Sequence, residues 1–244
     1  MPVQRGFHEP ADKPRRFYKA VSVEPSPDGF EVRLDARTVR TPKGAKLALP
    51  TRALADQVAE EWAAQGETIE VATMHVMRLA NTALEAIPAA RSETAEQVAQ
   101  YAGSDLLCYF AEGPGALVER QAAGWGPILD WAEAELGLRF VRVSGIIHQD
   151  QPQATLETVK ALALSLDDFR LAGLAFGSAL FGSTLLAIAV LKGRLSGEAA
   201  FDLSRVDEAF QEEKWGIDAE AAERTERLRA EAAMLERWFR ALEG

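Results

Sequence analysis

The chain has very little of the residue chemistry on which most catalytic and metal sites depend. Its 244 residues include one cysteine, Cys108, and three histidines, His8, His75 and His148. A single cysteine excludes an intrachain disulfide, and with it the disulfide-stapled class of secreted proteins. The histidines are far apart in sequence, and no H-E-x-x-H or C-x-x-C pattern is present. We therefore expect no metal site.

Motifs for nucleotides and for nucleophilic catalysis are absent as well. The sequence has no G-x-x-x-x-G-K-[ST] loop, no dinucleotide fingerprint and no G-x-S-x-G elbow. Cys108 lies in the apolar stretch 106–110, which favours a buried, inert thiol over a catalytic thiolate paired with His75 or His148. These absences give no indication of a nucleotide cofactor or of a covalent catalytic step.

The charge balance and the amino terminus narrow the possible partners and location. The formal net charge is -10, which disfavours nucleic acid and anionic membrane surfaces. Residues 1–14 contain three prolines and no apolar segment, so we expect a loose arm and neither a secretory signal nor a good mitochondrial transit peptide. These features, with heavy use of alanine and of arginine over lysine, predict a cytoplasmic, bacterial protein.

Residues 16–49 alternate in the manner of short β-strands separated by turns. We expect strands at 17–23, 30–34, 38–40 and 47–49, with turn residues at 25–29 and 41–44. Such short connections predict an antiparallel meander. A further short strand is expected at 68–71.

A helix is expected directly after these strands. Thr51 is a good N-cap residue, and Leu54, Val58 and Trp62 follow on one helical face. Gly66 is the expected stop. Because this apolar face needs a partner, we expect it to pack on the sheet.

After about residue 74 the pattern becomes helical. Helices are expected at 77–87, 91–110, 117–137 and 155–166, a short β-like piece at 139–147, and a last helix that repeats leucines at Leu228, Leu235 and Leu242. The fold class is therefore α+β: a small antiparallel β-rich domain with a packed helix, residues 1–74, followed by an all-α domain, residues 75–244.

One apolar run is long enough to raise the question of a membrane span. Residues 171–191 contain no charged side chain, and Gly173 and Gly177 form a small-xxx-small pair. About half of the run is Ala, Gly, Ser or Thr, and Gly182-Ser183 could break it. We expect a buried central helix against which neighbours pack closely. A membrane span or an apolar groove for a client protein is the alternative.

Residues 204–216 combine acidic side chains with a large aromatic one. Helical angles place Leu203, Val206 and Phe210 on one face and Asp207 at its flank. The opposite face carries Glu208, Gln211, Glu212 and Trp215. Tryptophan on a polar face is typical of a protein interface. Equally, Trp215 could pack back onto another helix, with Gly216 as the helix stop.

With these residues in view, the chain resembles a known family: the assembly chaperones of the F-type ATP synthase that act on the alpha subunit of its soluble F-one sector. The motifs that carry the resemblance occur in order over about residues 15–220: Arg16-Phe17-Tyr18-Lys19, Leu34-Asp35-Ala36-Arg37, Thr41-Pro42, Leu49-Pro50-Thr51, Glu61-Trp62, Leu79-Ala80-Asn81-Thr82-Ala83, residues 105–109, Trp125-Gly126-Pro127-Ile128, Trp131-Ala132 and residues 204–216. Ala36 departs from the glycine that the family often has, and Asp207 from a common glutamate.

The resemblance implies a binding protein without enzymatic activity, cofactor or small-molecule substrate. It would hold the unassembled alpha subunit and cover its beta-facing surface until the ring forms. Client contact is expected from Asp207, Glu208, Gln211, Glu212 and Trp215. Structural roles are expected for Phe17, Asp35, Pro50 and Trp62, the last locking the first helix onto the sheet. Two other functions stay open: a hydrolase that uses carboxylates in an interdomain cleft, and a membrane-associated factor that uses residues 171–191.

Overall fold

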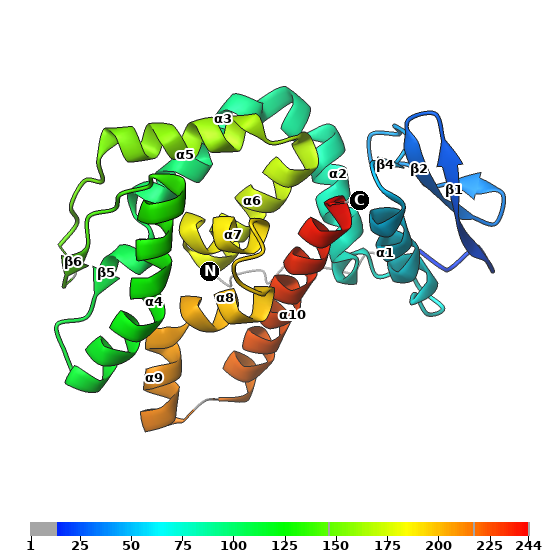
Figure 1. Ribbon diagram of the computed structural model, residues 1–244. Coiled ribbons are helices and arrows are strands. Elements are labelled where there is room, and N and C mark those ends of the chain that lie inside the picture. Colours follow the sequence, from blue (N-terminus) through cyan, green and yellow to red (C-terminus); the bar gives the residue numbers. More distant parts are fainter. Residues whose placement is uncertain (1–13, 146, 217, 244) are drawn as a thin grey trace, which may run out of the picture.

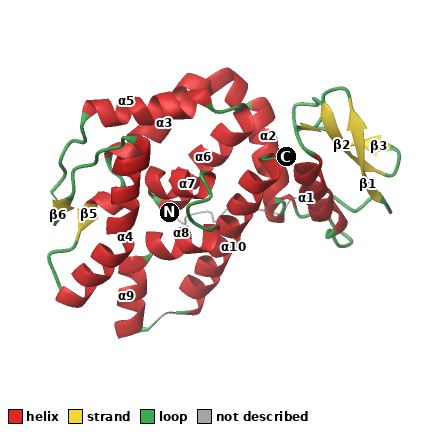
Figure 2. Cartoon of the chain, viewed as in Figure 1, coloured by secondary structure: helices red, strands yellow, loops and turns green. Residues whose placement is uncertain are grey.

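The main sheet and most of the helices occupy opposite ends of the molecule. The computed structural model of the protein describes residues 14–145, 147–216 and 218–243. A small sheet with one helix beside it lies at one end, and a larger group of helices lies at the other (Figures 1 and 2). The predicted α+β class is confirmed. Residues 1–13 of the predicted arm, which include His8, lie outside the described residues.

The sheet is built around strand β2. Strands β1 (Val21–Ser26) and β2 (Gly29–Leu34) form an antiparallel hairpin whose register pairs Ser26 with Gly29. The predicted strand at 17–23 therefore begins only at Val21. The reason is a turn closed by Asp35, whose carboxylate accepts hydrogen bonds from the backbone N–H groups of Lys19 and Ala20 and holds them outside the ladder.

The expected meander is wrong in one respect. Strands β3 (Arg37–Thr38) and β4 (Ala48–Leu49) both pair with β2, one after the other along the same edge. The chain between them leaves the sheet in an excursion closed by an antiparallel bridge between Arg40 and Lys46. Strand β4 therefore lies beside β2 in line with β3 and does not add a further strand to the edge of the sheet.

Helix α1 (Arg52–Ala63) covers the sheet as predicted. The Thr51 hydroxyl caps it by accepting from Leu54 N at 3.2 Å, and Leu54, Val58 and Trp62 are buried. Tyr18 donates its hydroxyl to the Trp62 carbonyl at 2.6 Å. The helix ends at Ala63, before Gly66, and the Arg16 guanidinium donates to the Ala63 carbonyl in its last turn and to the Gln65 carbonyl beyond it. Instead of the strand expected at 68–71, Thr68 makes an isolated bridge and a 3-10 turn, η1 (Val71–Thr73), follows.

Side chains from α1 reach directly into the helical part. The Glu61 carboxylate accepts from Val76 N and Met77 N, at 2.7 and 2.8 Å, and so caps the next helix. Thr51 Oγ1 donates to Ala241 O at 2.6 Å. One buried core runs through both regions. The division into domains 1–74 and 75–244 stays a prediction, and this junction is where it would fall.

The remaining elements form the helical part. They are α2 (His75–Glu85), α3 (Ile87–Gly103), the 3-10 turn η2 (Leu106–Cys108), β5 (Tyr109–Phe110), α4 (Gly115–Leu136), β6 (Val143–Ser144), α5 (Gln153–Ser165), α6 (Asp168–Phe181), α7 (Thr184–Leu191), α8 (Gly197–Ser204), α9 (Val206–Trp215) and α10 (Ala219–Leu242). The helix predicted at 91–110 ends at Gly103, and its last residues form η2 and β5, which pairs in parallel with β6. Among the described residues of the β-like piece at 139–147, only Val143–Ser144 form a strand.

The apolar run 171–191 is mostly buried but is not one helix. It breaks at Gly182, which has a φ of 61°, and Ser183 then caps α7 through Leu186 N. No helix formed by the described residues combines the length and hydropathy that crossing a membrane requires. A Cβ on Gly173 or Gly177 would stand 2.6 Å from the Phe239 ring or 2.7 Å from Leu235, so these glycines let α6 and α10 approach closely.

Candidate functional site

Helix α9 has one buried face and one open face. Val206 and Phe210 are buried, whereas Glu208, Gln211 and Trp215 are exposed. The segment 204–216 is not a single helix, because the backbone at Arg205 has φ -120° and ψ 21° and separates α8 from α9. Leu203, expected on the apolar face of this helix, therefore belongs to α8.

Trp215 is the largest exposed aromatic side chain of this surface. Its exposed fraction is 78%, so the alternative that it packs back onto another helix is wrong. The helix stops where expected: Gly216, at φ 80°, donates its N–H to Glu212 O at 2.8 Å. A tryptophan left in solvent at the end of a helix is a ready anchor for a protein partner.

Helix α4 holds the buried side of α9. The Arg120 guanidinium donates to both carboxylate oxygens of Glu213, at 2.6 and 2.9 Å, and these hydrogen bonds lower the pKa of Glu213. Arg120 also lies 5.3 Å from the centre of the Phe210 ring, and Lys214 Nζ lies 4.3 Å from it. The open face of α9 is thus presented on a braced helix.

The two remaining predicted contact residues are partly buried and already bonded. Asp207 Oδ1 accepts from Gln121 Nε2 at 2.6 Å, and Glu212 pairs with Arg205 Nη2 at 2.7 Å. The structure therefore brings the five predicted residues together on one helix, but in two groups. Glu208, Gln211 and Trp215 face solvent, and Asp207 and Glu212 are held by neighbours.

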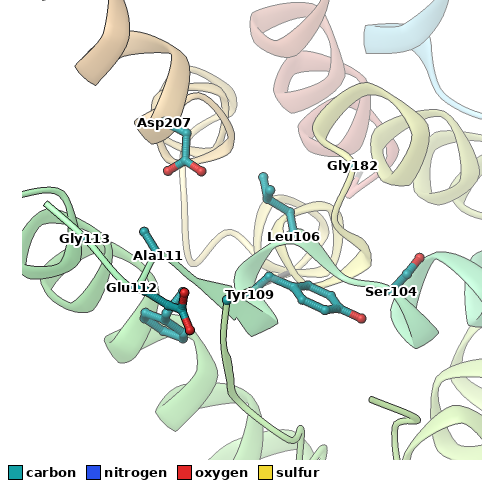
Figure 3. Close-up of a pocket in the computed structure, with 10 residues that line it drawn as sticks. Ser104, Leu106, Tyr109, Ala111, Glu112, Gly113, Gly182 and Asp207 are labelled. Carbon is teal, nitrogen blue, oxygen red and sulfur yellow. The ribbon is translucent and has the colours of Figure 1, made fainter. Parts of the chain in front are cut away.

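Asp207 also lines the wall of a cleft. The cleft has a volume of about 760 Å³ and lies between α9, β5 and the break between α6 and α7. Figure 3 shows Asp207 on one side of it, and Tyr109 and Glu112 on the segment opposite. Sequence reasoning missed these two residues, since nothing local marks them as neighbours of α9. It also missed Gln121, although a polar residue in the apolar series Leu117, Gln121, Trp125 of α4 was a usable signal.

The carboxylates with raised pKa act as helix caps. Asp105 is fully buried, and burial raises its pKa to about 6. It accepts hydrogen bonds from Ser183 Oγ, Leu185 N and Leu107 N. Glu61, whose pKa burial also raises, caps α2. Neither shift has a second carboxylate among its causes, so Asp105 and Glu61 are not members of a coupled carboxylate pair of the kind the hydrolase alternative needs.

Among the described residues, the cysteine and the two histidines do not come together in one site. Cys108 is buried, and burial raises the pKa of its thiol, with the Asp105 charge adding to the effect. His148 Nδ1 bonds to the Tyr109 hydroxyl at 2.8 Å, and His75 lies 3.5 Å from Glu231. Residues 14–145, 147–216 and 218–243 contain no group of three His, Cys, Asp or Glu side chains placed to hold a metal.

The four residues expected to have structural roles differ in their surroundings. Trp62 is buried, with its ring edge-to-face on Tyr18 at 5.6 Å. Phe17 is 56% exposed, and Pro50 is exposed just before the cap of α1. Asp35 closes the turn at a φ of 52°. Because this positive φ falls on Asp35, the alanine that follows it needs no glycine conformation. The roles themselves stay predictions.

Comparison with known proteins shows what the chain is similar to. A model of the family described as ATP12 chaperone protein matches residues 15–133. Atp12 from Paracoccus denitrificans is 39% identical, and its crystal structure matches 93% of this chain and 98% of that one with a TM-score of 0.87. A candidate chaperone from Agrobacterium tumefaciens is also 39% identical, with a TM-score of 0.87 over 94% of this chain and 86% of its own. The mitochondrial protein atp12 of Schizosaccharomyces pombe is 25% identical over 221 residues, which are 86% of this chain and 76% of that protein. Since the likeness takes in both the sheet with α1 and the helical part, the chain belongs to the ATP12 chaperone family.

Proposed function

We propose that this protein is an assembly chaperone of the F-type ATP synthase. It binds the unassembled alpha subunit, shields the surface that a beta subunit later covers, and releases it when the ring assembles. An unassembled subunit exposes an apolar interface that is prone to aggregation, so a protein that covers it has a clear physical task. Membership of the ATP12 chaperone family supports this proposal.

The main observation in favour of this site is the exposed Trp215 on α9, a helix that is held by contacts with α4. A side chain of that size left 78% exposed costs solvation free energy in the isolated protein, and a partner surface removes that cost. Glu208 and Gln211 lie beside it on the open face of α9. The matching client surface is an apolar pocket for the indole ring, rimmed by lysine or arginine side chains that pair with the carboxylates.

Binding and release then need no chemical step. A beta subunit that competes for the same alpha surface displaces the chaperone, and the sequence has no phosphate-binding loop to suggest a nucleotide cycle. We propose a binding protein without catalysis or cofactor, in the bacterial cytoplasm, with protein as its client and neither nucleic acid nor a membrane as its partner.

The test is co-purification of the protein with isolated alpha and beta subunits of the cognate ATP synthase, while light scattering of the alpha subunit is followed. Selective binding to alpha, lower scattering and release on addition of beta are the expected results. Binding to neither subunit, or equal binding to both, would overturn the proposal.

A charge reversal locates the contact. Glu208→Lys is expected to leave the fold intact, because this side chain is exposed, and to weaken alpha binding at least tenfold, since it turns an attraction into a repulsion. Glu93→Lys, the same change at an exposed position on α3, serves as the matched control and is expected to bind normally. Unchanged binding by Glu208→Lys would place the contact elsewhere.

A further inference from the structure

Gln121 is a buried polar side chain in an otherwise apolar stripe of α4. Its exposed fraction is 0%. A primary amide removed from water costs free energy unless both its ends are hydrogen-bonded, and an apolar residue would pack in such a place without that requirement. The position therefore calls for an explanation beyond packing.

Both ends of the amide are used, and they connect two parts of the site. Nε2 donates to Asp207 Oδ1 on α9 at 2.6 Å, and Oε1 accepts from Ala111 N after β5 at 2.7 Å. A carboxylate can only accept and a backbone N–H can only donate, so the partners fix the orientation of the amide. Gln121 thus joins α9 to the segment on the other side of the cleft.

Few other side-chain bonds among the described residues hold the start of α9. Its N-cap residue, Arg205, makes no side-chain capping hydrogen bond. One turn beyond Gln121, Trp125 Nε1 donates to Leu203 O at 2.9 Å, which fixes the end of α8 but does not touch α9. Burial of Val206 and the ion pair between Arg205 and Glu212 also hold this end of α9. The bond from Gln121 is the one that links the first turn of α9 to α4 and to the segment across the cleft.

The bond also directs the carboxylate itself. Among the described residues, Asp207 Oδ1 accepts from Gln121, and Oδ2 has no hydrogen-bond or ion-pair partner. Figure 3 shows the Asp207 carboxylate directed toward the cleft. A carboxylate bonded through one oxygen keeps the other one at a defined place for a partner.

We propose that Gln121 is a positioning residue of the client-binding surface: from inside the core it holds Asp207, and with it the first turn of α9, in the orientation that meets the client. This inference rests on the proposed function. By this inference, Gln121 contributes to client affinity although it does not touch the client.

The experiment is a double-mutant cycle on alpha-subunit binding with Gln121→Leu and Asp207→Ala. Gln121→Leu alone is expected to weaken binding about tenfold, the scale of one lost hydrogen bond to a charged group. In the Asp207→Ala background the same change is expected to weaken binding less than about twofold, because the residue on which it acts is gone. Raising the salt concentration is expected to weaken binding of the wild type more than binding of either variant.

A matched control separates positioning from loss of stability. Thr155→Val removes another buried hydrogen bond, from Thr155 Oγ1 to Arg139 O at 2.7 Å, on α5 and away from α9. It is expected to lower the melting temperature comparably and to leave alpha binding unchanged. Where Gln121→Leu melts below the assay temperature, Gln121→Met, which keeps the length of the side chain, replaces it.

The outcomes distinguish this inference from the function on which it rests. If Asp207→Ala binds the alpha subunit as the wild type does, both the placing of the contact and the positioning role fail. If Asp207→Ala binds weakly but the folded Gln121 variant binds normally, only the positioning role fails. The role is also overturned if Gln121→Leu weakens binding equally with and without Asp207, or if Thr155→Val weakens it as much.

Discussion

Helices α1 and α9 each carry a tryptophan in the last turn, and the two side chains have opposite surroundings. Trp62 of α1 is 7% exposed, and Trp215 of α9 is 78% exposed. Each follows two glutamates: Glu60-Glu61 stand directly before Trp62, and Glu212-Glu213 stand before Lys214 and Trp215. Acidic neighbours therefore do not distinguish the two positions.

The difference comes from the angle between each tryptophan and the apolar stripe of its helix. Trp62 continues the series Leu54, Val58 at intervals of four, so the sheet that covers the stripe covers the ring as well. Trp215 lies on the side away from Val206 and Phe210, which α4 covers. One tryptophan contributes to stability, and by our proposal the other contributes to recognition.

The largest expected effect breaks the buried side of this comparison. Trp62→Ala is expected to lower the free energy of unfolding by about 3–5 kcal/mol, since it leaves a cavity between α1 and the sheet. Denaturant unfolding followed by circular dichroism measures it. Trp62→Phe is expected to cost clearly less, because it keeps a ring and removes an indole N–H that has no partner among the described residues. Equal losses in the two variants would contradict this account of the packing.

Burial also affects the carboxylate of Asp105, and this effect makes the stability of the protein depend on pH. Burial raises the pKa of Asp105 from 3.8 to about 6, so between these values the folded state binds more protons than the unfolded state. The contribution of Asp105 to stability is therefore fully present below about pH 4 and is lost as the pH rises through about 6, by up to about 3 kcal/mol for a shift of about two pKa units.

The measurement is the free energy of unfolding of the wild type and of Asp105→Asn at pH 4 and at pH 7. We expect the loss caused by the substitution to be larger at pH 4, because the protonated acid of the wild type is the form that burial favours. A loss of the same size at both pH values, or a larger one at pH 7, would show that Asp105 does not titrate in this range.

The smallest expected change in stability breaks the exposed side. Trp215→Ala is expected to change the free energy of unfolding by no more than about 0.5 kcal/mol, since the indole ring is mostly in solvent. By our proposal it weakens alpha-subunit binding by about thirtyfold or more, as expected for an interface anchor. Isothermal calorimetry of the variant and unfolding of the same preparation give both numbers. A stability loss as large as that of Trp62→Ala would reverse the comparison.

The sequence predicted those parts of the fold in which apolar residues recur on one face of a helix. The stripe of α1, its Thr51 cap and the burial of Leu235 and Leu242 in α10 follow from helical spacing, and the structure has them. The place of β4 did not follow. Strand β4 has only two residues, too few to show an alternation of apolar and polar side chains. Its pairing with β2 depends on the path of the excursion closed by Arg40 and Lys46.

The candidate site was predictable only along its own helix. Helical angles were enough to group Glu208, Gln211 and Trp215 on one face of α9, but whether another element covers that face is a question of tertiary packing. Gln121 lies 86 residues before Asp207 in the chain, so only the packing of α4 on α9 reveals the pair.

The hydrogen bond from Thr51 to Ala241 has a consequence for the order of synthesis. A ribosome makes the sheet and α1 first, and domains commonly fold as they emerge. Here the Thr51 hydroxyl finds its acceptor, and Gln57 its partner at the Arg237 carbonyl, only after the chain has been made as far as α10. The contacts of Thr51 and Gln57 with α10 can therefore form only after the last helix has been made. A nascent chain stalled before α10 would leave these two side chains without their acceptors.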